Sequence, residues 1–224
     1  MSRNESSQKA RALVAGLKTE KPKLDRRTVR TRNLLGDALI ELIQEKPFDS
    51  VTVQDVLDRA GVGRSTFYVH YKDKDDLFFS DAEEFLEMMA MALSRKKDTS
   101  DRVVPVREFF AHVAEAKRLY TSLIESGRIH TFMELAQGLF ARGIAQRLAE
   151  LPRSCGIDPA RRTALGQAHA GALMSLLKWW LDQNKRESPE HMDELFHSMV
   201  WSGVGADNGQ AASTVSQSPT GKRV

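Results

Sequence analysis

Residues 52–74, T-V-Q-D-V-L-D-R-A-G-V-G-R-S-T-F-Y-V-H-Y-K-D-K, decide how the surrounding part of the chain folds. Thr52 and Asp55 have the spacing of a capping box, in which a hydroxyl and a carboxylate satisfy the free amides of a helix start. Apolar residues then recur at helical spacing, which predicts a two-turn helix. Gly61 predicts the end of that helix, because glycine adopts the left-handed conformation of a C-cap without steric cost.

A second short helix is expected from about residue 63 to residue 70. Phe67 and Tyr71 are four residues apart, so both can point inward. The other side chains cannot all share that face, and most carry hydrogen-bonding groups: Arg64, Ser65, Thr66, Tyr68 and His70. So small an anchor is typical of a helix that enters the DNA major groove, where base edges offer donors, acceptors and methyl groups. Two such helices joined by a tight turn form a helix-turn-helix.

The next helix should begin at about Lys74, with Asp73 as its N-cap. Lys72 and Lys74 lie beside this helix start, where amide and ammonium groups both favour phosphate. We predict that Arg64 reads a base directly and that Lys74 contacts phosphate. The full set of predicted DNA contacts is Thr52, Arg64, Ser65, Thr66, Tyr68, Val69, His70, Lys72, Lys74, Arg27 and Arg30.

The run from about residue 27 to residue 85, above all A-G-V-G-R-S-T-F-Y-V-H-Y-K-D-K-D-D-L, resembles the N-terminal domain of the TetR/AcrR family of bacterial transcriptional regulators. The turn glycine, F-Y-x-H-Y and K-x-K fall in the family's order and spacing. Gly63 departs from the pattern, since a serine or threonine cap is usual there. Thr66, Tyr68 and His70 match positions that meet phosphates or bases in the family.

This resemblance implies a homodimeric repressor that places two reading helices on a near-palindromic, double-stranded DNA operator. A small apolar or amphipathic effector, bound in a larger C-terminal domain, would favour one spacing of the two heads and so change operator occupancy. Two alternatives remain open within the class. The regulator could lack a small-molecule effector and respond to a protein partner, or it could act as an activator.

Positive charge is concentrated at the start of the chain, where residues 1–32 carry ten Lys or Arg against three acidic residues. We expect residues 1–24 to be a disordered basic arm. Basic residues adjoining a DNA-reading module can follow phosphates or enter the minor groove. Those nearest the module are Lys21, Lys23, Arg26, Arg27, Arg30 and Arg32.

Composition places the chain among globular proteins, because 224 residues with 41% hydrophobic content can bury a sizeable core in one or two domains. We expect no membrane span, since no run of about eighteen uncharged apolar residues occurs, and no signal peptide. The single cysteine fits the reducing cytoplasm, where we expect the protein to work.

The expected architecture is all-α. A first helix from about residue 25 or 26 to residue 46 should cover the two short helices and end at Pro47, with an apolar stripe of Leu35, Ala38, Leu39, Leu42 and Ile43. Further helices are expected at about 74–95, 102–126, 131–151, 159–184 and 189–203. The predicted domains are the helix-turn-helix domain at 25–73, an effector-binding and dimerisation domain at 74–203, and a disordered tail at 204–224.

The last two helices have apolar faces too wide for one core, which favours a four-helix contact with a second copy. The predicted dimer interface comprises Leu173, Leu176, Leu177, Trp180, Leu195, Phe196 and Met199. The predicted effector pocket lies among the middle helices and comprises Phe85, Met89, Phe109, His112, Phe132, Met133, His169 and Trp179. Histidines on apolar helical faces need a hydrogen-bond partner, which an effector could supply.

No catalytic motif is present: the six histidines form no H-E-x-x-H, one cysteine offers no zinc pair, and no G-x-S-x-G elbow or phosphate-binding glycine loop occurs. We therefore predict no enzyme activity, no cofactor and no metal. An enzyme fused to a DNA-binding head remains the rival class, which a turnover screen would reveal. A solidly packed set of middle helices would instead favour a regulator without an effector.

Overall fold

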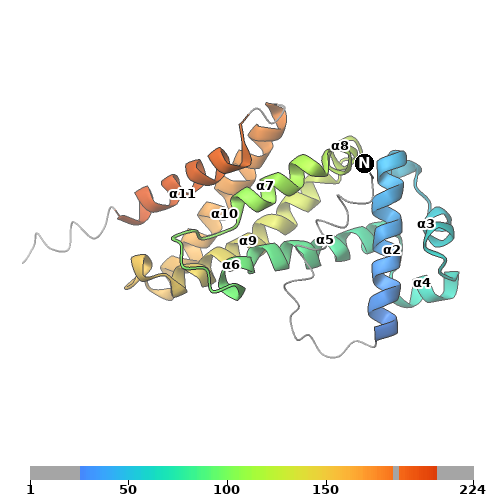
Figure 1. Cartoon of the computed structure of the whole chain (residues 1–224), viewed down its shortest axis with the longest axis horizontal. Coiled ribbons are helices and arrows are strands. Elements are labelled where there is room, and N and C mark those ends of the chain that lie inside the picture. The colour runs from blue at the N-terminus through green and yellow to red at the C-terminus, as the bar shows by residue number, and fades with distance from the viewer. Residues whose placement is uncertain (1–25, 184–186, 206–224) are drawn as a thin grey trace, which may run out of the picture.

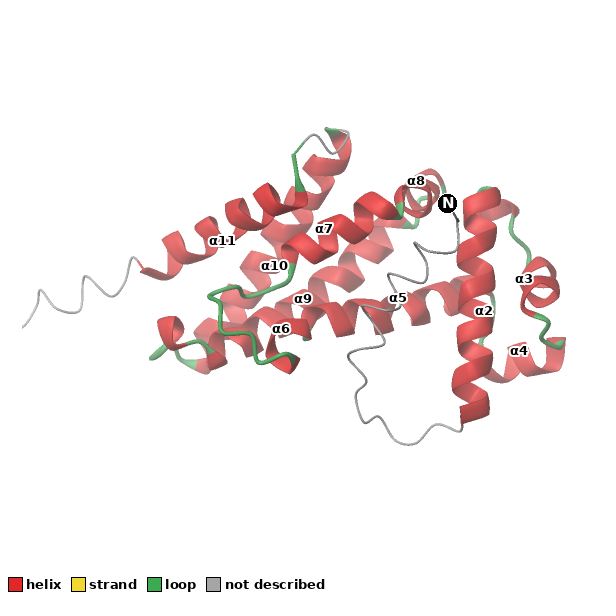
Figure 2. Ribbon diagram, viewed as in Figure 1, coloured by secondary structure: helices red, strands yellow, loops and turns green. Residues whose placement is uncertain are grey.

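The computed structural model describes residues 26–183 and 187–205. Within these ranges the chain forms helices joined by loops and turns, and no strand (Figure 2). The predicted all-α fold is therefore confirmed. The basic arm predicted at residues 1–24 lies outside the described residues, as does the tail from residue 206 onward. The last helix continues to Gly205, so residues 204 and 205, which were predicted as part of the tail, are helical.

The N-terminal head, defined here as residues 26–78, consists of three helices and the start of a fourth. Figure 1 shows the two short helices lying along one side of the long first helix. Its core is formed by the predicted stripe of the first helix together with Phe48, Val56 and Phe67, which are fully buried. The elements are α2 (Arg26–Glu45), η1 (Phe48–Ser50), α3 (Val53–Ala60), α4 (Arg64–His70) and the first turn of α5 (Lys74–Ala90).

Helix α5 connects the head to the C-terminal bundle, defined here as the rest of α5 with the helices that follow. The sequence predicted one helix over residues 74–95, but α5 ends at Ala90 and a short helix, α6 (Ala92–Arg95), follows. A close approach accompanies the break. A Cβ added at Gly143 of α9 (Ile129–Glu150) would lie 2.4 Å from the Ala90 carbonyl oxygen. The prediction of a single helix was therefore wrong, because no residue near the break indicates this tertiary contact.

The C-terminal bundle is built around two long helices, α9 and α10 (Pro159–Asp182), which pack closely along their length. At Gly166 an added Cβ would lie 2.4 Å from the Ala141 carbonyl oxygen, so glycine permits this approach. Helix α5 also packs on α9, and α7 packs on α11. The elements are α7 (Val106–Glu115), α8 (Lys117–Glu125), α9 (Ile129–Glu150), η2 (Pro152–Ser154), α10 (Pro159–Asp182) and α11 (Pro189–Gly205).

Residues 102–126 were predicted as a single helix, and this prediction was wrong. Val103 and Val104 are buried in a bent loop, α7 starts only at Val106, and the chain turns at Ala116 before α8 begins. The turn allows α7 to lie along α11 while α8 reaches the C-terminal end of α2 (Figure 1). Among the described residues, no helix has both the length and the apolar character needed to cross a bilayer.

Candidate nucleic-acid interface

Helix α3 is capped at both ends by the residues that the sequence predicted. The Thr52 hydroxyl accepts a hydrogen bond from the Asp55 amide at 3.1 Å, and the Asp55 carboxylate accepts one from the Thr52 amide at 2.8 Å. The Lys46 ammonium lies 2.8 Å from the same carboxylate, and the hydrogen bonds from Lys46 and Thr52 lower the pKa of Asp55. Gly61 adopts the left-handed conformation at φ 64°, so the chain can turn sharply into α4.

Helix α4 is anchored by one fully buried side chain, Phe67, and Tyr71 packs beside it just after the helix. Tyr68 and Val69 are 53% and 77% exposed. Arg64, Ser65 and Thr66 are exposed as well, and His70 is half-buried. An exposed aromatic ring and an exposed valine add nothing to the head's core. This face is therefore available to a partner, as expected of a helix that reads DNA.

The Arg64 guanidinium is oriented by a short chain of hydrogen bonds across the turn. Its Nη2 donates to Gln54 Oε1 at 2.8 Å, and Gln54 Nε2 donates to Asp58 Oδ1 at 2.7 Å. All three side chains are exposed. Arg64 therefore lies at the edge of α4 with donors available to a base edge, since arginine carries five N–H donors and only one is used here.

Arg32, predicted to belong to the DNA-contacting basic residues, has an additional structural role. Its Nε donates to the Tyr71 hydroxyl at 2.9 Å, and its guanidinium lies 3.7 Å from Glu84. Burial raises the pKa of Tyr71. This hydrogen bond joins α2 to the end of α4, and Figure 1 shows the N-terminal end of α2 beside α4. The exposed Arg27 and Arg30 lie on this same part of α2.

Lys74 does not have the role that the sequence predicted. Its ammonium donates to the carbonyl oxygens of Phe48 and Val51, both at 2.7 Å, and to that of Asp49 at 3.3 Å. Burial, together with the nearby Arg128, lowers its pKa. Three acceptors match the three donors of an ammonium group. We therefore remove Lys74 from the phosphate contacts and retain Lys72, which is exposed.

In the C-terminal bundle, the half-buried side chain of His112 lies between two aromatic rings. Its ring centre is 4.3 Å from that of Phe85 and 6.3 Å from that of Tyr120. Burial lowers the pKa of His112 to about 4. Of the other predicted pocket residues, Met89, Phe109 and Phe132 are buried, whereas Phe85 and Met133 are half-buried.

The depressed pKa of His112 predicts a pH-dependent stability. The unfolded chain, with a pKa of about 6.5, takes up this proton before the folded protein does. The free energy of unfolding should therefore be highest above pH 6.5 and fall by up to about 3 kcal/mol as the pH approaches 4. His112→Phe should lose this part of the decrease, measured by urea unfolding at pH 7.5 and pH 5. An equal decrease in both proteins would contradict the assignment.

Two further pocket predictions have different outcomes. His169 lies on α10, and its Nε2 is buried without a hydrogen-bond partner. Its ring centre lies 6.4 Å from that of Phe196. Its pKa is lowered by burial. Trp179 was predicted to line the pocket, but its side chain is 44% exposed on the outer face of α10. That prediction was wrong, because position 179 lies on the opposite side of the helix from the bundle core.

The predicted dimer interface divides into buried and exposed residues. Leu173, Leu177, Trp180 and Phe196 are fully buried within the protomer, so their assignment to the interface was wrong. Their faces are occupied by neighbouring helices of the same chain, as in the contact of Trp180 with Phe110 at 4.9 Å between ring centres. Leu195 and Met199 are 36% and 39% exposed, and Leu176 is half-buried. These three residues and Trp179 are apolar side chains of α10 and α11 that the protomer leaves at least partly exposed, and we refer to the four together as the apolar outer face of α10 and α11.

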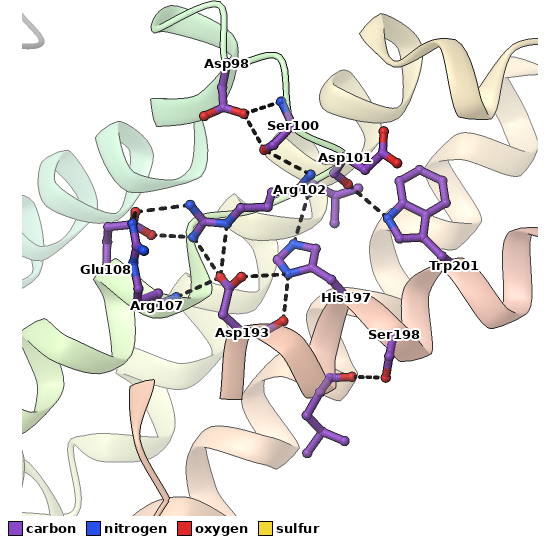
Figure 3. Close-up of polar contacts among 12 residues, drawn as sticks. Asp98, Ser100, Asp101, Arg102, Arg107, Glu108, Asp193, His197, Ser198 and Trp201 are labelled. Atoms are coloured by element: carbon purple, nitrogen blue, oxygen red, sulfur yellow. Dashed lines mark hydrogen bonds and ion pairs between the residues drawn. The ribbon is translucent and has the colours of Figure 1, made fainter. Parts of the chain in front are cut away.

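Sequence reasoning missed a partly buried polar network that holds α11 to the segment before α7 (Figure 3). Arg102 donates to Asp193 at 2.7 Å and lies 2.5 Å from Glu108. The Val103 amide donates to His197 Nε2 at 3.1 Å, which leaves the hydrogen on Nδ1, 2.8 Å from the Asp193 carbonyl oxygen. The only sequence signal was a set of charged residues, which looks the same as a solvated helix face.

Arg147 of α9 is a second residue that the sequence did not indicate. It is almost completely buried. Its Nη2 donates to the carbonyl oxygens of Asp98 at 2.5 Å and Ser100 at 3.0 Å, and its Nε donates to that of Arg102 at 3.1 Å. Arg147 therefore satisfies the backbone of the loop that connects α6 to α7.

Comparison with known proteins agrees with this geometry. The family model for bacterial regulatory proteins of the tetR family matches residues 35–80, and the model for a transcriptional regulator C-terminal region matches residues 106–201. The first contains the helix-turn-helix, and the second contains α7 to most of α11. Together these matches include α4 of the head and, in the C-terminal bundle, α7 to most of α11.

Similar individual proteins are also regulators. The chain is 35% identical over 176 residues, 73% of its length, to the uncharacterized HTH-type transcriptional regulator YxbF of Bacillus subtilis (strain 168), and it spans 43% of that protein. It is 27% identical over 158 residues to the HTH-type transcriptional repressor Rv1474c of Mycobacterium tuberculosis (strain ATCC 25618 / H37Rv), which covers 70% of this chain and 79% of that protein.

A solved structure confirms the fold. The fatty acid degradation regulator FadR from Bacillus halodurans is similar with a TM-score of 0.55 and 17% identity, covering 83% of this chain and 98% of that chain. The fold and the helix-turn-helix define a DNA-binding class of regulator. The chain belongs to the TetR family of bacterial transcriptional regulators, as the sequence resemblance indicated.

Proposed function

We propose that this protein is a transcriptional repressor that binds a near-palindromic operator as a homodimer and is released by a small-molecule effector. The observation that carries the proposal is the uncovered face of α4. Its side chains are exposed around a single buried anchor, Phe67, and they include hydrogen-bonding groups suited to base edges. The family of the chain and the repressor name of the Mycobacterium relative support the same function.

Dimerisation is supported by the apolar outer face of α10 and α11. Trp179, Leu195 and Met199 are large apolar side chains that the protomer leaves exposed. Exposed apolar residues that gather on adjacent helices are typical of a protein interface. A two-fold axis through this face would pair the two helices with their copies, and each operator half-site would receive one α4.

Effector control is supported by the surroundings of His112. The imidazole is neutral at physiological pH and lies against Phe85 and Tyr120 among apolar helices. A neutral imidazole offers one donor and one acceptor to a polar group of an otherwise apolar ligand. We propose that the effector is a small apolar or amphipathic molecule that contacts Phe85, His112 and Met133. Native mass spectrometry of protein purified from its host would detect a retained ligand.

Arg64→Ala tests the function itself. The wild-type protein should select one sequence from a pool of random duplexes, and the variant should bind the selected duplex about 1 to 3 kcal/mol more weakly, with relaxed preference at one base pair per half-site. Arg142→Ala, which removes an exposed arginine of α9, is the matched control and should leave selection unchanged. If the wild-type protein selects no sequence, the proposed function is wrong. If Arg64→Ala keeps full selectivity, Arg64 is not part of the readout.

A further inference from the structure

Helix α8 and the start of α9 contact residues 44–51 of the head. We call these residues the corner of the head. The Phe48 amide donates to the Ser122 hydroxyl at 2.9 Å, and this bond is buried. At the end of α2, the Gln44 carbonyl oxygen accepts a hydrogen bond from Arg118 at 2.5 Å. Both side chains belong to α8 and both partners are backbone atoms of the head. Such bonds fix direction as well as distance.

Arg128, at the start of α9, contacts the same corner from a second side. Its Nη1 donates to Asp49 at 2.7 Å, while its Nε and Nη2 form a two-pronged contact with the Asp75 carboxylate, the Nη2 bond being 3.2 Å. The guanidinium carbon also lies 4.3 Å from the centre of the Phe48 ring. A planar fork that meets a carboxylate with two bonds permits little rotation.

Arg128 contacts the head at two places. Asp49 lies in the short helix η1, and Asp75 lies in the first turn of α5, directly after α4. Lys74 bonds the same corner from α5, through the carbonyl oxygens of Phe48 and Val51. Arg128 is therefore part of a polar cluster that connects α5, η1 and α9. Without it, the head would be connected to the bundle through α5 and the contacts of α8.

A continuous set of packed helices leads from this corner to the outer apolar face. Arg128 precedes α9, which packs along its length on α10, and α10 carries Trp179. The orientation of α4 relative to that face thus depends on how firmly the corner is held. In a dimer formed through that face, the same contacts would set the distance and angle between the two reading helices.

We propose that Arg128, supported by Ser122, is a positioning residue that sets which half-site spacing the dimer accepts. This inference rests on the proposed function, because it needs a dimer bound to a two-fold operator. One inserted base pair moves a half-site by about 3.4 Å and rotates it by roughly a tenth of a turn. A dimer whose heads are held by directional bonds should bind such an altered operator weakly. A dimer whose heads are held less firmly should bind it almost as well as the preferred operator.

The test uses the full-length protein and the operator recovered by selection with the wild-type protein. Duplexes with one base pair removed from, or added to, the centre of the operator are titrated with wild type, Arg128→Ala and the exposed-arginine control Arg142→Ala. We expect Arg128→Ala to bind the preferred spacing at least about fivefold more weakly, and to lose most of the discrimination against the altered spacings. Arg142→Ala should match wild type in both measurements.

Each result supports or overturns the inference. A flattened spacing profile for Arg128→Ala, with base preference within each half-site unchanged, supports it, since Arg128 then acts on geometry and not on base reading. A spacing profile identical to wild type overturns it and leaves the proposed function intact. Failure of the wild-type protein to select a sequence overturns the proposed function instead. Should Arg128→Ala not fold, Arg128→Lys, which keeps the charge and loses the fork, is judged by the same criterion.

Discussion

Replacing Arg147 with methionine is expected to lower the free energy of unfolding by about 3 to 5 kcal/mol, because partners of a buried charge are left unsatisfied. The guanidinium is almost completely buried and donates to three carbonyl oxygens of the loop between α6 and α7. It also lies 3.4 Å from the Glu150 carboxylate. Methionine fills a similar volume but donates no hydrogen bond, so the loop carbonyls would have to find water or remain unpaired. Urea unfolding at pH 7.5 measures the effect.

Arg142→Met is the matched control for this change. Arg142 lies five residues earlier on the same helix, but its side chain is exposed. Substitutions at exposed positions without special contacts usually change stability by less than about 0.5 kcal/mol. The comparison therefore separates burial from the loss of one positive charge. Similar stabilities for the two variants would show that the loop carbonyls are satisfied without Arg147.

The elements of the head were predictable because the signals that define them are local. Thr52 and Asp55 cap α3, Gly61 ends it and Asp73 caps α5, and each acts on backbone groups within four residues. Capping of this kind depends on side-chain chemistry and spacing, both of which are visible in a sequence. Phe67 was also identifiable as the anchor of α4, since it is a large apolar residue among polar neighbours.

The breaks at Met91 and Ala116 were not predictable, since neither is marked by proline or glycine. They arise from packing between distant segments, such as the approach of Gly143 to Ala90. Lys74 illustrates the same limit in the candidate site. An ammonium group beside a helix start does favour phosphate. In the fold, however, the Lys74 ammonium donates to three carbonyl oxygens that lie more than twenty residues earlier in the chain. Local spacing gives no indication of those acceptors.

The apolar stripes of α10 and α11 were recognised, but their division between core and surface was not. A stripe more than half-way around a helix indicates that two partners exist without indicating which residues face each of them. In the structure, Leu173 and Leu177 face the bundle and Trp179 faces outward. The outer face, as corrected by the structure, is therefore the surface that a second copy is expected to cover.

Introducing two carboxylates on that outer face, with Leu195→Glu and Met199→Glu combined, is expected to convert the proposed dimer to a monomer. Both residues lie on α11, four positions apart, and both are partly exposed. A second copy would bring the charges into an apolar contact without a counter-ion, which costs several kcal/mol. Sedimentation velocity measures the assembly, and the monomer should bind the selected operator at least about a hundredfold more weakly, because the second half-site no longer benefits from linkage.

Ile124→Glu is the control for adding charge to an exposed apolar position, since Ile124 is 51% exposed and belongs to α8 and not to α10 or α11. This variant should remain a dimer. The double variant should still unfold in one cooperative transition, because neither Leu195 nor Met199 is part of the buried core, but at a lower midpoint, since it loses the stabilisation that dimerisation provides. A double variant that stays dimeric would place the interface on another face. A monomeric variant with undiminished operator affinity would instead show that one reading helix is sufficient for binding.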